Sequence, residues 1–67
     1  MSARVHPTAV VDRAARLAEG VVVGPLAVVG PDVELGEGTE LFPHATVLGP
    51  ARLGRRNRIH PHAVVGG

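Results

Sequence analysis

The chain has 67 residues, of which 45% are hydrophobic and one is aromatic, and its formal net charge is +1. This length allows one small domain, and the absence of cysteine excludes disulfide bonds and thiolate metal sites as its source of stability. The near-neutral charge and single aromatic residue argue against a nucleic-acid-binding protein, which needs a concentrated basic face and stacking aromatics.

The hydrophobic residues are also too dispersed for a membrane protein. No apolar run approaches the roughly 20 residues that a spanning helix needs, and the start lacks the apolar segment of a signal peptide. We therefore predict a cytoplasmic protein without a membrane span. Association with further copies is the remaining way to stabilise so small a domain.

Residues 1–4 are predicted to be a short tail, and from residue 5 one motif recurs every 18 residues. It reads aliphatic, any, Pro, any, Ala, any, Val, and it begins at residues 5, 23, 41 and 59. A finer period of six runs through residues 5–67. Its aliphatic positions are Val5, Val11, Leu17, Val23, Val29, Leu35, Leu41, Val47, Leu53, Ile59 and Val65. Such hexapeptide repeats are typical of parallel β-helices.

A helical interpretation fails, because six is not a multiple of 3.6 and six prolines with nine glycines would break helices repeatedly. Each hexad instead predicts a strand with a small inward residue, an outward residue and an aliphatic inward residue. The first expected strands after the tail are 9–11, 15–17, 21–23 and 27–29. Three hexads make one 18-residue coil, so we predict an all-β, three-sided prism of about three and a half coils.

Corners separate these strands. The prolines of the motif fall at one corner, where a missing N–H breaks no ladder bond. Gly20 and Gly38 stand at other corners, where a positive φ is wanted. Leu48 stands where glycine is usual, so we expect an altered corner over residues 47–50.

The outward residues distinguish the three sides. Two sides are largely charged, with outward columns Arg16, Glu34, Arg52 and Val22, Glu40, Arg58. β-branched residues favour strands even when exposed, but a continuous apolar column on the third side indicates a partner surface. We therefore predict an oligomer interface formed by Val10, Val28, Thr46 and Val64, with His44 at its border.

Few other residues are candidates for a functional site, and most of them are histidines and arginines. The 18-residue spacing stacks His44 beside His62, and places His60 in one column with His6. Stacked imidazoles can share a proton, bind an anion or ligate a metal, but histidines that only pack are the favoured interpretation. An arginine cluster at 52–58 could contact a phosphate or an acidic carrier, although a solvated corner is more typical.

Nucleophilic catalysis is nearly excluded, because the one serine is Ser2 and the chain contains no cysteine, lysine or tyrosine to act as the nucleophile. General acid–base chemistry through histidine is the simplest catalytic option. We assign no catalytic, substrate-binding or metal residue, and expect no cofactor.

Residues 5–11 (VHPTAVV) and 23–39 (VGPLAVVGPDVELGEGT) resemble the opening of the acyl-carrier-protein–UDP-N-acetylglucosamine O-acyltransferases, the first enzymes of lipid A synthesis. Residues 53–59 and 63–67 fit the same pattern, so the resemblance covers residues 5–67. It implies a left-handed parallel β-helix and a homotrimer with active sites between subunits. The implied reaction moves a 3-hydroxyacyl group from acyl carrier protein to the 3-hydroxyl of UDP-N-acetylglucosamine, with histidine as general base.

In that family the catalytic histidine and the nucleotide-sugar residues lie in later coils, and no position of this chain matches them. The chain is therefore expected to be an N-terminal part, truncated at its C-terminal end and inactive alone. Two alternatives stay open. One is a non-catalytic β-helical assembly module. The other is a fragment of another hexapeptide transferase such as the related N-acyltransferase, which is expected to carry an extra N-terminal domain.

Overall fold

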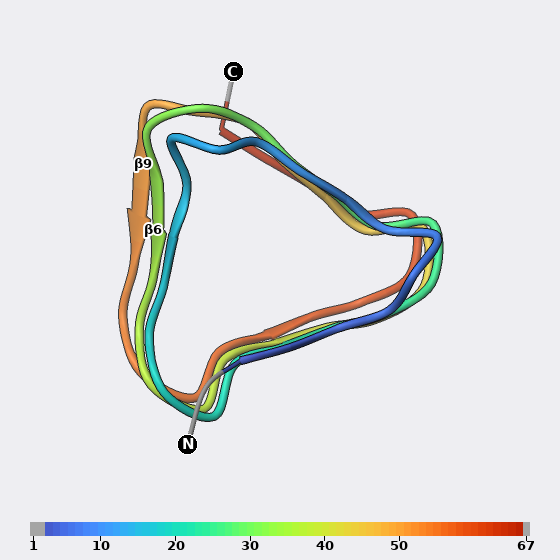
Figure 1. The fold of residues 1–67 in the computed structure, drawn as a ribbon, viewed down its shortest axis with the longest axis horizontal. Helices are drawn as coiled ribbons and strands as arrows, with labels where there is room; N and C mark the ends of the chain where they lie inside the picture. Colours follow the sequence, from blue (N-terminus) through green and yellow to red (C-terminus); the bar gives the residue numbers. More distant parts are fainter. Residues whose placement is uncertain (1–2, 67) are drawn as a thin grey trace.

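The computed structural model describes residues 3–66, which wind as a left-handed parallel β-helix with three sides (Figure 1). This confirms the predicted fold class. Every element in these residues is a short strand. In chain order the strands are β1 (Arg4–Val5), β2 (Val10–Val11), β3 (Arg16–Leu17), β4 (Val22–Val23), β5 (Val28–Val29), β6 (Val33–Leu35), β7 (Glu40–Leu41), β8 (Thr46–Val47), β9 (Ala51–Leu53), β10 (Arg58–Ile59) and β11 (Val64–Val65).

The strands form three parallel sheets, one on each side of the prism. We call β1-β4-β7-β10 sheet A, β2-β5-β8-β11 sheet B and β3-β6-β9 sheet C. Within each sheet, neighbouring strands pair residues that are 18 apart in sequence, such as Val5 with Val23 and Val11 with Val29. Sheet C is on the left of Figure 1, where β6 and β9 are labelled. The 18-residue period is therefore one full coil.

Most strands are one residue shorter than predicted, because the small inward residue before each strand belongs to the turn. The N–H of Ala27, for example, donates to the carbonyl of Gly24 within the corner, at 3.3 Å. The carbonyl of the same residue accepts from the N–H of Val10 in the preceding coil, at 2.9 Å. Strands β6 and β9 keep three residues, and there the N–H of Ala51 donates across the sheet to Asp32.

A left-handed backbone recurs every six residues at the corners. Gly20 and Gly38 have φ values of 78° and 72°, as predicted. Five further positions with positive φ are not glycine, which the sequence did not predict: Leu26, Asp32, His44, Arg56 and His62. They occupy the third position of four-residue turns of the kind that favours a positive φ there.

The corner at residues 47–50 is altered, as predicted. Pro50 occupies the place in the six-residue period where a positive φ recurs, but its ring holds φ near −65°. The corner instead contains a cis Gly49–Pro50 peptide bond. A Cβ atom at Gly49 would overlap the carbonyl oxygen of Pro31 in the preceding coil. Glycine is therefore required there by the close approach of two backbones.

The core is a stack of aliphatic side chains along the inside of the prism. Its fully buried members lie in the middle coils: Val21, Val23, Ala27, Val29, Val33, Leu35, Leu41, Ala45 and Val47. Thr39 is also fully buried, and its hydroxyl donates to the carbonyl of Gly54 at 2.9 Å. Filling the interior with aliphatic groups leaves function to the outward columns and the corners.

Candidate functional site: an apolar face beside a histidine corner

The outer surface of sheet B is largely apolar, with three valines and one threonine in its outward column. Register pairs Val10 with Val28, Val28 with Thr46, and Thr46 with Val64, so the four side chains form one column. Val10 and Val64 are 62% and 65% exposed. We call this column the apolar face. A column of this kind on the outside of a small protein is typical of a surface that contacts a partner.

Two exposed leucines lie beside the apolar face in addition to the predicted residues. Leu26 is 52% exposed at the corner before β5, and Leu48 is 37% exposed directly after β8. Leu26 has a left-handed φ and Leu48 lies at the altered corner, and both side chains are exposed. The signal that could have identified them is an apolar residue at a corner position of the 18-residue pattern, where the equivalent residues are polar or glycine.

The other two sides carry charge, as predicted. On sheet C, Arg16 lies opposite Glu34, and Glu34 opposite Arg52. On sheet A, Val22 lies opposite Glu40, and Glu40 opposite Arg58. Charged columns of alternating sign are well solvated, so sheet B is the side suited to a dry protein contact.

His44 lies where the prediction placed it, at the border of the apolar face, two residues before Thr46 of β8. Its imidazole stacks on that of His62, with ring centroids 4.8 Å apart and planes inclined by 13°. Both residues have a left-handed backbone, with φ values of 66° and 64°. The backbone N–H of His44 also donates to the carbonyl of Pro25, at 3.1 Å, which joins this corner to the preceding coil.

The other two histidines of this corner have different neighbours. His60 lies beside Phe42, with ring centroids 5.7 Å apart. The Nδ1 atom of His6 lies 2.9 Å from the hydroxyl oxygen of Thr8. That hydroxyl oxygen also accepts a hydrogen bond from the backbone N–H of Leu26, at 3.1 Å. All four histidines therefore lie along one corner of the prism, but only His44 and His62 stack ring on ring.

The arginine cluster lies at the corner between sheets C and A. Arg52 Nε lies 3.2 Å from Glu34 Oε1, and Arg55 Nε lies 3.9 Å from Glu37 Oε1. All four arginines of residues 52–58 are exposed. The arrangement agrees with a solvated corner, in which each ion pair contributes little.

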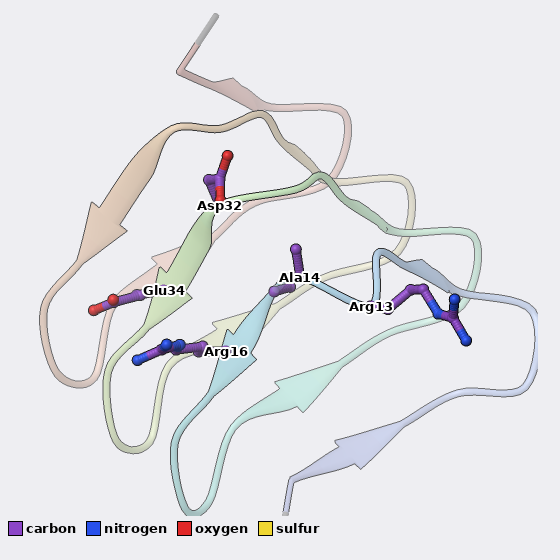
Figure 2. A pocket seen from close by; sticks show the side chains of 6 residues that line it. Arg13, Ala14, Arg16, Asp32 and Glu34 are labelled. Atoms are coloured by element: carbon purple, nitrogen blue, oxygen red, sulfur yellow. The ribbon is translucent and has the colours of Figure 1, made fainter.

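A polar hollow lies between the first two coils, lined by Arg13, Ala14, Ala15, Arg16, Asp32 and Glu34. Arg16 and Glu34 extend side by side from neighbouring strands, whereas Arg13 points away from both (Figure 2). The charged groups do not converge on one point, so this hollow has no arrangement for holding a reacting group. Within residues 3–66 no group of three or more potential metal ligands occurs, and no helix has the length and apolar character of a membrane span.

Solved structures of two enzymes resemble the chain closely. The UDP-N-acetylglucosamine acyltransferase of Francisella novicida is 40% identical over 92% of this chain, with a TM-score of 0.89. The UDP-N-acetylglucosamine acyltransferase of Arabidopsis is 42% identical over 92% of this chain, with a TM-score of 0.91. The chain spans 22% of the length of each enzyme. No protein-family model and no curated protein sequence matches it.

Proposed function

We infer that this chain forms part of the β-helix of a UDP-N-acetylglucosamine acyltransferase. The observation that carries the inference is identity of 40–42% over 92% of the chain, at TM-scores of 0.89 and 0.91. Similar shape alone would follow from any hexapeptide repeat. Identity at this level over nearly the whole chain adds sequence similarity to the similarity of shape. The resemblance recognised in residues 5–11 and 23–39 is confirmed by these neighbours.

The reaction we propose for the whole protein moves a 3-hydroxyacyl group from acyl carrier protein to the 3-hydroxyl of UDP-N-acetylglucosamine, in lipid A synthesis. This follows from the family resemblance. We further propose that residues 1–67 do not catalyse it alone. In support, no described histidine is paired with a carboxylate, which would orient it as a general base. His44 and His62 contact one another, and His60 contacts Phe42.

We propose that the apolar face packs against other copies of the subunit in a homotrimer. The support is the contrast between sheet B and the charged sheets A and C, together with the exposure of Val10, Val28 and Val64. Leu26 and Leu48 would enlarge the buried area at both edges of this contact. A cytoplasmic location remains a prediction, which cell fractionation would test.

A chimera tests the proposed function. Residues 5–66 would replace the aligned coils of the Francisella novicida acyltransferase, and acyl transfer to UDP-N-acetylglucosamine would be measured. We expect the chimera to keep its activity, and the 67-residue chain alone to show none. The control replaces the same coils by β-helix coils of equal length from an unrelated hexapeptide protein.

A folded chimera without activity would contradict the assignment, and turnover by the isolated chain would contradict its proposed inactivity. The same exchange made in the related N-acyltransferase tests whether the chain is a fragment of that enzyme instead. Activity there, but not in the O-acyltransferase, would favour the N-acyltransferase. Loss of activity in both folded chimeras would favour the non-catalytic module.

A further inference from the structure

The corner between sheets A and B contains all four histidines of the chain and is formed by residues 6–9, 24–27, 42–45 and 60–63. We call it the histidine corner. We propose that, in the homotrimer, the apolar face of each subunit packs against the histidine corner of the next subunit. This inference rests on the proposed homotrimer, and it adds the second surface that every subunit must contribute to the contact.

A ring of three identical subunits needs two different surfaces on each subunit. A surface that pairs with itself is related to its partner by a two-fold axis and therefore ends in a dimer, whereas a closed ring of three joins one surface to a different one. The apolar face therefore cannot supply both sides of the contact in a trimer. A second surface has to exist elsewhere on the same chain.

The distribution of charge identifies that second surface. All seven arginines and six acidic residues lie within residues 3–66, and they belong to sheets A and C and to the two corners that border sheet C. The corner between sheets B and C contains Asp12 and Asp32, and that between sheets C and A contains Glu37, Arg55 and Arg56. Neither sheet B nor the histidine corner contains an arginine, aspartate or glutamate. Because taking an unpaired charge out of water is costly, the histidine corner is the one other surface suited to a dry contact.

The histidine corner also has the side chains expected of a subunit contact. Leu26 is 52% exposed, and Phe42, in a chain without tyrosine or tryptophan, is partly exposed beside His60. The rings of His44 and His62 are exposed and stacked, with centroids 4.8 Å apart. Aromatic side chains are enriched in protein interfaces, where charged ones are depleted. This composition suits a contact with the valines of the apolar face.

Hydrogen bonds between coils hold this corner in shape. The backbone N–H of His44 donates to the carbonyl of Pro25 at 3.1 Å, and the backbone N–H of Leu26 donates to the hydroxyl oxygen of Thr8 at 3.1 Å. A surface that is already ordered loses little conformational freedom on binding. In Figure 1 the histidine corner is the right-hand vertex of the prism, opposite sheet C, and it adjoins sheet B. The charges of sheet C therefore lie away from the proposed contact.

Charge substitutions at two corners test the proposal, with the oligomer of the 67-residue chain measured by sedimentation or light scattering. Replacing His44→Asp puts an unpaired charge in the proposed contact, and should weaken association by about 10-fold or more. The matched control is Arg56→Asp at the corner between sheets C and A. Both residues are exposed and have a left-handed φ, at 66° and 55°, a backbone that aspartate tolerates. The control changes the charge more than His44→Asp does, and should still leave the trimer intact.

Mixing two variants tests whether the two surfaces lie on opposite sides of the contact. Val28→Glu disrupts the apolar face and keeps the histidine corner, and His44→Asp does the reverse. Neither variant should form a trimer alone. In an equimolar mixture, the intact face of one variant should bind the intact corner of the other, and a complex with one copy of each should form. Two variants of a single self-pairing surface would not complement each other in this way.

The outcomes separate this inference from the proposed homotrimer. A monomeric unmodified chain would overturn both. A trimer that survives in the folded His44→Asp variant, or that dissociates equally in the Arg56→Asp control, would overturn the assignment of the histidine corner alone. Absence of the mixed complex would do the same. Leu26→Asp provides a second variant of this corner, in another coil and with a φ of 60°, and circular dichroism establishes that each variant is folded.

Discussion

Arg52 Nε lies 3.2 Å from Glu34 Oε1, although the two residues are separated by a full coil in the sequence. The pair belongs to a larger pattern in which glutamates of one coil meet arginines of the next. At three positions an acidic residue is followed 18 residues later by a basic one: Glu34 and Arg52, Glu37 and Arg55, Glu40 and Arg58. A slip of the coil register would separate these charges, so the pattern favours the observed stacking.

The first prediction concerns this pattern. Replacing Arg52→Glu puts like charges opposite one another, and should lower the free energy of unfolding by at most about 1 kcal/mol, because both side chains are exposed. Urea denaturation at low and at high salt measures the effect. We expect high salt to diminish it, and the neutral variant Arg52→Gln to lose less. A loss that does not change with salt would show that the arginine acts through packing instead.

The second prediction concerns the apolar face. Replacing Val28→Glu places a charge in the middle of this face, and should dissociate the proposed trimer because an unpaired charge is costly to bury in an interface. Light scattering or sedimentation measures the oligomer. The matched control is Val22→Glu, since Val22 lies in the same coil and is 37% exposed, against 36% for Val28.

We expect the Val22→Glu protein to keep the oligomeric state of the unmodified chain. An unchanged oligomer in the Val28→Glu variant would remove the apolar face as the subunit interface. Equal dissociation by both variants would show that the charge acts by destabilising the coil, because the two valines belong to different sheets.

The third prediction concerns the altered corner. Replacing Gly49→Ala forces a Cβ atom into the carbonyl group of Pro31, and should destabilise the fold by about 1–3 kcal/mol, as overpacking does. The control is Gly54→Ala, where the nearest atom to an added Cβ is Asn57 Nδ2 at 3.9 Å. That variant should be neutral or gain about 0.4–1 kcal/mol. Thermal unfolding measures both, and similar melting temperatures would contradict the close approach at Gly49.

The fourth prediction concerns the buried hydroxyl of Thr39. Replacing Thr39→Val removes its hydrogen bond to Gly54, and should cost about 0.5–1.5 kcal/mol, the usual net value of such a bond. The cost stays in this range because the Gly54 carbonyl keeps the amide of Asn57, at 3.2 Å. Chemical denaturation measures it, with Thr46→Val as the comparison on the outward face. Equal stability of the Thr39→Val and unmodified proteins would mean that this bond adds nothing.

Much of the fold could be predicted because its regularities are local and repeated. The period of six identifies inward and outward positions, since side chains alternate along a strand. The period of 18 identifies which residues stack, and the pairs Val5 with Val23 and Leu17 with Leu35 follow from it. The stacking of His44 on His62 was predicted in the same way, and it is confirmed.

The parts that could not be predicted depend on contacts between coils. Nothing local indicates that Leu26, Asp32 and Arg56 adopt a left-handed backbone, which is usually left to glycine. Most strands are also one residue shorter than predicted. The N–H of the residue before the strand donates within the turn, as Ala27 does to Gly24, and so is not used for pairing between strands. The left-handed coil was implied by family resemblance alone, since parallel crossovers are generally right-handed.

The sequence by itself therefore determined a three-sided parallel β-helix, its inward columns and the contrast between one apolar and two charged sides. These follow from residue type and period, which are properties of a single chain segment. Tertiary structure alone decided the backbone of the corners, the pairing of Arg52 with Glu34 and the ring geometry of His44 and His62. The physical reason is that these features are set by atoms one coil away, whose distances depend on how the coils stack.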